Sequence, residues 1–232
     1  MKNIAIIPAR GGSKRIPKKN IKKFWGKPII AYSIETALQS NIFDEVMVST
    51  DDKEIAEIAI KYGAKVPFFR SQKTSDDFAT LSDVVFEVIQ TYKNKKQTEF
   101  ENICCILPTA PFIQIEDLKK SYNKLIASSF DSVFPVVKFN FPIQRAMQFN
   151  GEKIQMIWTE NLNKRSQDLP GSFHDAGLFY WIKSQVFLKE KKLWTNNTSA
   201  IIIDSQKAQD IDTFDDWKIA ELKYKILNEQ KH

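Results

Sequence analysis

Hydrophobic positions along the chain alternate between short continuous runs and longer stretches with helical spacing. The first run, residues 4–7, contains no polar residue and is typical of a strand buried on both faces. Residues 28–40 begin with proline and then place apolar side chains three and four positions apart, which predicts a helix. This alternation favours βαβ units.

The same alternation continues to the end of the chain. Asp51, three residues before Glu54, is predicted to cap a helix through Tyr62, and Thr80 with Asp83 is predicted to cap another. The pattern predicts an α/β fold with a Rossmann-like, mostly parallel sheet. Further strands are expected at 46–49, 66–69, 103–107, 131–137, 178–181 and 200–203, and further helices at 116–128 and 213–227.

Residues 138–175 interrupt this regular pattern. The helical period disappears there, and short alternating pieces flank Asn150-Gly151, a strong signal for a β-hairpin. A long excursion from a regular α/β domain usually carries function or a subunit contact. We therefore expect one domain over residues 1–232, with a β-rich excursion at 138–175 used for dimerisation.

Composition narrows the choice of partners and location. A net charge of +6, from 34 basic and 28 acidic residues, favours anionic ligands, but no nucleic-acid-binding motif is present. Two histidines are too few for a His/Cys zinc site, and the adjacent Cys104 and Cys105 are expected to be buried thiols on opposite faces of a strand. No apolar stretch approaches the ~20 residues that span a bilayer, so we expect a cytoplasmic protein.

The loop at residues 8–20 follows the first strand and is rich in glycine and cations. Gly11 and Gly12 are expected to adopt positive φ and to present N–H groups to oxygen atoms. A cationic loop at the carboxyl end of a parallel strand is suited to a triphosphate, which disfavours the alternative of a solvated basic turn. The spacing is neither that of a P-loop nor that of a dinucleotide fingerprint. The cations are Arg10, Lys14, Arg15, Lys18 and Lys19.

Several motifs together carry a family resemblance. Ile-Pro-Ala-Arg-Gly-Gly-Ser-Lys-Arg-Ile-Pro-x-Lys-Asn at 7–20 is followed by motifs at 26–30, 48–52, 109–111 and 210–213. In this order they resemble the cytidylyltransferases that activate nine-carbon keto acids, over nearly the whole chain. The resemblance implies a fold of the nucleotide-diphospho-sugar transferase type, a CTP-dependent reaction that releases pyrophosphate, and a homodimer.

The resemblance also implies residues for the nucleotide. Arg10 and Lys14 would act in catalysis by neutralising charge on the phosphates. Arg70, from the residues alone, is equally consistent with a surface arginine. Sialic acid enzymes carry a glutamine and two serines where this chain has Leu107, Ala79 and Leu81, which disfavours sialic acid as the substrate. The implied nucleotide site is Arg10, Gly11, Gly12, Ser13, Lys14, Lys19, Asn20, Arg70 and Thr109.

Asp210 and Asp212 form a D-x-D pair near the end of the chain. In an extended segment the two side chains project to the same side, and paired carboxylates suit Mg²⁺ bound together with substrate phosphates. This predicts a catalytic metal site. The alternative is that Asp212, Asp215 and Asp216 only favour the dipole of the final helix.

The last part of the excursion is expected to bind the sugar. Arg165 is the clear counterpart of the arginines that grip the sugar carboxylate or phosphates in the family. Gln167, Asp168, His174 and Asp175 belong to a segment that resembles the pseudaminic acid branch. A structural hydrogen bond in the loop that enters a strand is the alternative for His174. Sialic, legionaminic and 3-deoxy-octulosonic acids remain alternative substrates, and a non-catalytic nucleotide-binding protein is a distant one.

Overall fold

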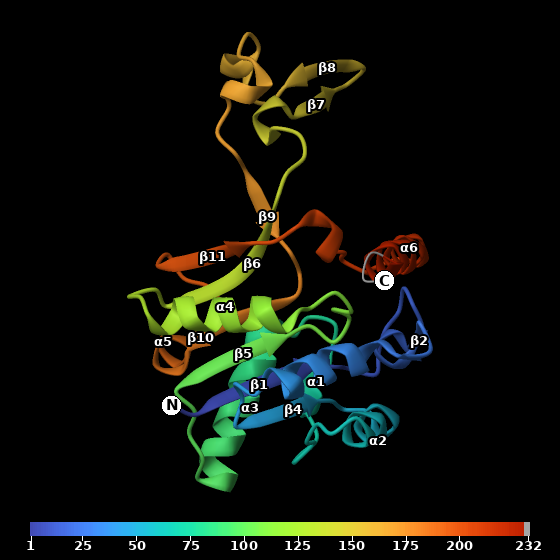
Figure 1. Ribbon diagram of the computed structural model, residues 1–232, viewed down its shortest axis with the longest axis vertical. Coiled ribbons are helices and arrows are strands. Elements are labelled where there is room, and N and C mark those ends of the chain that lie inside the picture. Colours follow the sequence, from blue (N-terminus) through green and yellow to red (C-terminus); the bar gives the residue numbers. More distant parts are fainter. Residues whose placement is uncertain (230–232) are drawn as a thin grey trace.

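A seven-stranded mixed sheet is the centre of the computed structural model, which describes residues 1–229 (Figure 1). The strand order is β11-β6-β10-β5-β1-β4, and β9 pairs with β6. The pairs β1–β4, β1–β5 and β6–β11 are parallel, whereas β9 and β10 run antiparallel to their neighbours. The predicted α/β fold with a mostly parallel sheet is therefore confirmed. The strands are β1 (Asn3–Pro8), β4 (Glu45–Ser49), β5 (Asn102–Ile106), β6 (Ser132–Lys138), β9 (Phe173–Asp175), β10 (Phe179–Lys183) and β11 (Thr198–Ile202).

Helices cover both faces of the sheet, because side chains alternate along each buried strand. Ile7 packs in a cluster with α1, α2 and α4, whereas Ile6 packs with α3 and α5. Cys104 and Cys105 fall into these opposite clusters as buried free thiols, as predicted. Within residues 1–229 no helix is long and apolar enough to cross a membrane. The bounds are α1 (Ile29–Ser40), α2 (Lys53–Lys61), α3 (Leu81–Lys96), α4 (Ile115–Ile126) and α5 (Ser184–Glu190), with short 3-10 helices η1 (Lys19–Ile21), η2 (Gln72–Thr74) and η6 (Ser205–Lys207).

A third apolar cluster joins the two ends of the chain. The final helix, α6 (Phe214–Glu229), packs against the small hairpin of β2 (Lys23–Phe24) and β3 (Lys27–Pro28). The rings of Phe24 and Trp217 meet edge-on with their centroids 5.6 Å apart, and Phe24 is fully buried. Ile211, just before α6, belongs to the same cluster. Burial of α6 therefore holds the segment around Ile211 beside the N-terminal part of the chain.

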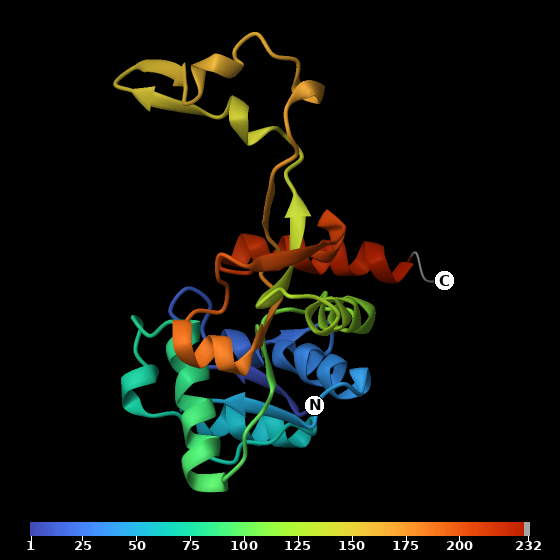
Figure 2. The same cartoon turned by 90° about the vertical axis from the view of Figure 1, so that its left-hand side faces the viewer.

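The chain between β6 and β9 leaves the sheet as one arm, residues 139–172 (Figures 1 and 2). Lys138 pairs with Phe173, so the last residue of β6 and the first of β9 form its base. The predicted hairpin is confirmed, with Gly151 at φ 62° in its turn. The arm contains β7 (Met147–Asn150), β8 (Lys153–Met156), η3 (Ile143–Arg145), η4 (Thr159–Asn161) and η5 (Ser166–Asp168).

Two local predictions are wrong, and one helix was not predicted. Asp52, and not Asp51, caps α2, because Asp52 has extended backbone and its carboxylate accepts from the N–H groups of the first helical turn. Residues 66–69 form no strand: Lys65 makes an isolated bridge to Met47, and Pro67, two residues further on, has no N–H to continue the pairing. The helix α5 was not predicted, because it is short and begins at Ser184, directly after the last residue of β10.

The start of α6 provides a test of local stability. The hydroxyl of Thr213 accepts from the Asp216 N–H at 3.2 Å, and the Asp216 carboxylate accepts from the Thr213 N–H and hydroxyl, both at 2.8 Å. Replacing Thr213→Ala should lower the free energy of unfolding by about 1 kcal/mol. Thr213→Ser keeps the hydroxyl, so its free energy of unfolding should fall much less. Urea unfolding of both variants measures the difference.

The same contact has a defined pH dependence. The Thr213 hydroxyl and N–H hold the pKa of Asp216 below its usual range. An acid with a lowered folded-state pKa stabilises the fold above its unfolded value, about 3.9, and this contribution disappears as pH falls through the folded value. The loss caused by Thr213→Ala should therefore shrink in acid. This capping arrangement would be contradicted if Thr213→Ser lost as much free energy of unfolding as Thr213→Ala. It would also be contradicted if the loss in Thr213→Ala did not change with pH.

Candidate active site

The loop after β1 is held in place by two polar side chains. The Gly11 N–H donates to the Asp51 carboxylate at 3.0 Å, and this contact explains why Asp51 does not cap α2. Asn20 is buried, and its amide donates to the Arg10 carbonyl at 2.9 Å. Asn20, predicted to lie beside the nucleotide, therefore fixes the backbone of the loop as well as lining the cleft that the loop borders.

The positive φ predicted for the two glycines of the loop is wrong, although the Gly11 N–H does face an oxygen atom, that of Asp51. Neither Gly11 nor Gly12 has positive φ. A Cβ on Gly11 would lie 2.8 Å from the Asp52 carboxylate and 3.0 Å from its Cβ, whereas a Cβ on Gly12 would meet nothing within 4 Å. The loop thus passes too close to the start of α2 for a side chain at Gly11, and close approach is the constraint there.

Carboxylates balance the cations of the loop. Asp77 pairs with Arg10 at 2.8 Å and with Lys14, and these two cations hold the pKa of Asp77 below its usual range. Asp212 pairs with Arg15 at 2.9 Å and lies 3.4 Å from the Lys19 ammonium. Because these pairs are largely exposed, each contributes little to stability. Phosphate oxygens can therefore replace the carboxylates at low cost.

The structure brings most of the predicted nucleotide residues to one cleft of about 340 Å³. Gly11 and Gly12 belong to the loop that borders it. Asp77 and Thr80, which were not predicted as site residues, also line this cleft. Sequence gives little signal for Asp77, because its partners Arg10 and Lys14 lie more than sixty residues away. The predicted residues that line the cleft are Arg10, Ser13, Lys14, Lys19, Asn20, Arg70, Thr109, Asp210 and Asp212.

Arg70 is half-buried against β4. Its guanidinium donates to the Ser49 carbonyl at 2.6 Å and to the Thr74 carbonyl at 3.3 Å. Burial lowers the pKa of Arg70, although Asp51 and Glu87 oppose this. Arg70 is therefore a fixed cation in the wall of the cleft, and the alternative of a freely solvated arginine is excluded.

Asp210 and Asp212 flank a buried residue and both reach the cleft. Ile211 is fully buried, so the carboxylates on either side of it are directed away from the core. Burial and the neighbouring Asp212 raise the pKa of Asp210, whereas Lys19 lowers it. At the start of α6, Thr213 and Asp216 form the reciprocal cap, while Asp212 faces Arg15 and Lys19.

A second cleft, of about 510 Å³, adjoins the first, since Leu107 and Asp210 line both. Asp175 is fixed in its wall: one carboxylate oxygen accepts from the Gly177 N–H at 2.8 Å and the other from the Tyr180 hydroxyl at 2.5 Å. His174 lines this cleft from within strand β9, and not from a loop as predicted. Its ring lies edge-on against Phe139, 4.9 Å between centroids.

Arg165, Gln167 and Asp168 do not reach either cleft of their own chain. They lie at and within η5, a part of the arm. Arg165 instead forms a two-contact ion pair with Asp168, at 2.7 and 3.1 Å. Within one chain the structure therefore does not bring these three residues together with His174 and Asp175.

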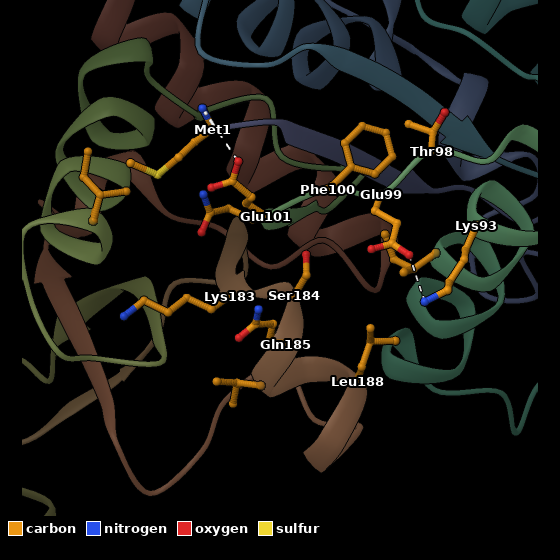
Figure 3. A pocket seen from close by; sticks show the side chains of 14 residues that line it. Met1, Lys93, Thr98, Glu99, Phe100, Glu101, Lys183, Ser184, Gln185 and Leu188 are labelled. Carbon is orange, nitrogen blue, oxygen red and sulfur yellow. Dashed lines mark ion pairs between the residues drawn. The ribbon is translucent and has the colours of Figure 1, made fainter.

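A further cavity, of about 420 Å³, lies at the other end of the sheet (Figure 3). Asn102, where β5 begins, and Lys183, where the antiparallel β10 ends, both line it. Phe100 and Leu188 give it apolar walls, with the Lys93–Glu99 ion pair at one side. None of the predicted site residues lines this cavity; apart from the three in the arm, they gather at the carboxyl ends of the parallel strands.

A cationic cleft at the carboxyl ends of parallel strands defines a nucleotide-binding α/β protein. The sequence profile described as cytidylyltransferase matches residues 4–231, and the chain belongs to this family. The predicted resemblance and the predicted class of CTP-dependent nucleotidyltransferase are thereby confirmed.

Individual relatives match over the whole length. The chain is 44% identical over 230 residues to the pseudaminic acid cytidylyltransferase of Campylobacter jejuni, with 99% of each chain covered. It is 32% identical to the CMP-N,N'-diacetyllegionaminic acid synthase of Legionella pneumophila, again with 99% of each covered. A solved CMP:2-keto-3-deoxy-manno-octonic acid synthetase complexed with CTP is similar at a TM-score of 0.71 and 18% identity, covering 99% of this chain and 100% of that one. At that identity the likeness establishes the fold alone.

The two glycines of the loop form a matched pair for mutagenesis. Gly11→Ala should lower the free energy of unfolding by about 1–3 kcal/mol, because the new methyl group would press on Asp52 at the start of α2. Gly12→Ala should change it by no more than about 0.5 kcal/mol, because the space is open. Urea unfolding of both variants measures this. Equal losses in the two variants would show that close approach to α2 does not constrain the loop.

Proposed function

We propose that this cytidylyltransferase couples CTP to a nine-carbon keto sugar acid, pseudaminic acid, and releases pyrophosphate. The observation that carries the proposal is that Asp210 lines both clefts, so a nucleotide in the first and a sugar in the second would meet beside it. The activity named for the Campylobacter jejuni relative, at 44% identity, supports the choice of sugar. The relative named for legionaminic acid is less similar, at 32% identity.

The first cleft would bind the triphosphate. Arg10 and Lys14 would exchange their partner Asp77 for phosphate oxygens, which carry more charge than one carboxylate. Ser13 and Thr109 line the same cleft and would add hydroxyl donors. Positive charge held at this wall would stabilise the pyrophosphate as it leaves.

Asp210, at the junction of the clefts, and Asp212, in the first cleft, fit Mg²⁺. This ion takes one or two carboxylates and completes its shell with substrate phosphates and water. Asp210 and Asp212 would hold the ion. When bound, it would offset the charge on the phosphates during displacement of pyrophosphate.

The second cleft would orient the sugar. With its two oxygens fixed by Tyr180 and Gly177, Asp175 would accept a hydrogen bond from a sugar hydroxyl or an acetamido N–H. His174 lines the same wall. The anomeric hydroxyl would then attack the α-phosphorus of CTP in line with the bond to pyrophosphate. We place this reaction in the cytoplasm, where CTP is made.

A panel of purified sugar acids tests the proposal. Pseudaminic, legionaminic, sialic and 3-deoxy-octulosonic acids are each incubated with CTP and Mg²⁺, and pyrophosphate release is measured. We expect the highest kcat/KM with pseudaminic acid. Turnover with another acid alone would overturn the choice of sugar, and CTP binding without turnover of any would favour a non-catalytic protein.

Two aspartate variants in the same assay test the metal site. Asp212→Asn should abolish pyrophosphate release with an unchanged unfolding transition, whereas Asp215→Asn, on the exposed side of α6, should keep it. Full activity of Asp212→Asn would contradict the assignment of this carboxylate.

We further propose that the arm forms a homodimer and carries Arg165, Gln167 and Asp168 to the sugar cleft of the other subunit. Two features support this. The arm projects from the sheet, and it exposes many large apolar side chains, an arrangement typical of an unfilled protein interface (Figure 2). These are Phe141, Met147, Phe149, Ile154, Ile157, Trp158 and Leu162.

A charge in the arm should separate the subunits. Phe149→Glu is expected to shift the protein from dimer to monomer in sedimentation velocity and to raise the KM for the sugar acid. Phe78→Glu changes a phenylalanine outside the arm that is even more exposed, at 91% against 77% for Phe149, and should leave the dimer intact. A wild-type monomer, or a dimer that survives Phe149→Glu, would contradict this role of the arm.

A further inference from the structure

Lys223 is a cation of α6 that lines the second cleft. Other lysines of this helix pair with acids on the helix itself: Lys218 lies 3.4 Å from Asp215, and Lys225 lies 3.7 Å from Glu229. Within residues 1–229 no carboxylate forms an ion pair with Lys223. Its charge is therefore uncompensated at the wall of a cleft.

Backbone carbonyls fix the Lys223 ammonium. It donates to the Ala208 carbonyl at 2.9 Å and approaches the Ser205 carbonyl at 3.4 Å, both in the turn around η6. An ammonium has three N–H donors, so one is left after these two contacts. Burial also lowers the pKa of Lys223, because the charged form loses water. An anion in the cleft would stabilise the charged ammonium and so offset this loss of water.

The charges around the second cleft create a need for such a cation. Asp175 and Asp210 line it, and both repel an acidic sugar. Arg165, the arginine that the sequence offers for the sugar carboxylate, lies in the arm, which would carry it to the other subunit, so Lys223 is the cation that a chain supplies to its own cleft. Among the described residues that line this cleft, Lys223 is the lysine and no arginine is present.

We infer that Lys223 binds the carboxylate of the acidic sugar and so selects sugar acids over neutral sugars. This rests on the function proposed above. The carbonyls of Ser205 and Ala208 hold the ammonium at one wall, and Asp210 stands where the two clefts meet. The carboxylate at Lys223 would orient the sugar toward the nucleotide.

Lys223→Gln tests this, with Lys225→Gln on the same helix as control. A charged hydrogen bond lost from the sugar complex should raise the KM for the sugar acid at least about tenfold. The Kd for CTP should stay within about twofold, since Lys223 does not line the first cleft. Lys225→Gln should change neither value. An unchanged sugar KM in Lys223→Gln, or an equal rise in the Kd for CTP, would overturn the inference.

Wild-type enzyme in the same assay separates the two claims. If wild type releases no pyrophosphate with any of the sugars, the proposed function is refuted. If wild type turns over the sugar acid and Lys223→Gln has the same KM for it, only the role of Lys223 is refuted. A second measurement does not depend on the variant folding or on turnover. Acetylation of Lys223 in wild type by an amine-reactive reagent, followed by mass spectrometry, should be slowed by the sugar acid and not by its methyl ester. Equal rates with and without the acid would overturn the inference.

Discussion

The site depends on one contact between the two ends of the chain. The Lys19 ammonium donates to the Ile211 carbonyl at 2.6 Å, across 192 residues of sequence. This contact ties the loop after β1 to the segment that carries Asp210 and Asp212. The contact is possible because Phe24 and Trp217 bury α6 against the N-terminal hairpin. The phosphate loop and the acidic pair therefore form one cleft only in the folded chain.

The ion pairs in this cleft are weak, so another anion can replace their carboxylates. Asp77 and Asp212 neutralise the cations of the loop from the surface, where ion pairs are weak and solvent competes. Such pairs keep the loop ordered, but they are too weak to prevent a more highly charged anion from binding to its cations. Asp210 differs, since burial and a like charge raise its pKa, and a divalent cation would relieve both effects. In the proposed function, phosphate oxygens would replace these carboxylates at the cations, and a metal ion would offset the charge of the acidic pair.

Sequence predicted the sheet well, because buried parallel strands have continuous apolar runs. Most of the residues that it assigned to the nucleotide line one cleft, because the loop follows the first of these strands. Sequence failed where a residue's role depends on a distant neighbour. Gly11 is required by the approach of Asp52, and Asp51 serves the loop in place of its own helix. Asp77 and Lys223 show no local motif. Sequence also does not reveal that residues 139–172 project as an arm, which places Arg165 outside the sugar cleft of its own chain.

A crystal structure with CTP and Mn²⁺, used for its anomalous scattering in place of Mg²⁺, tests the central claim most directly. The account predicts the triphosphate against Arg10 and Lys14 in the first cleft, with Asp77 displaced from both. It also predicts an anomalous peak bound by Asp210 or Asp212 together with phosphate oxygens, at the junction with the second cleft. A triphosphate in the cavity at the other end of the sheet, or a metal remote from both aspartates, would contradict it.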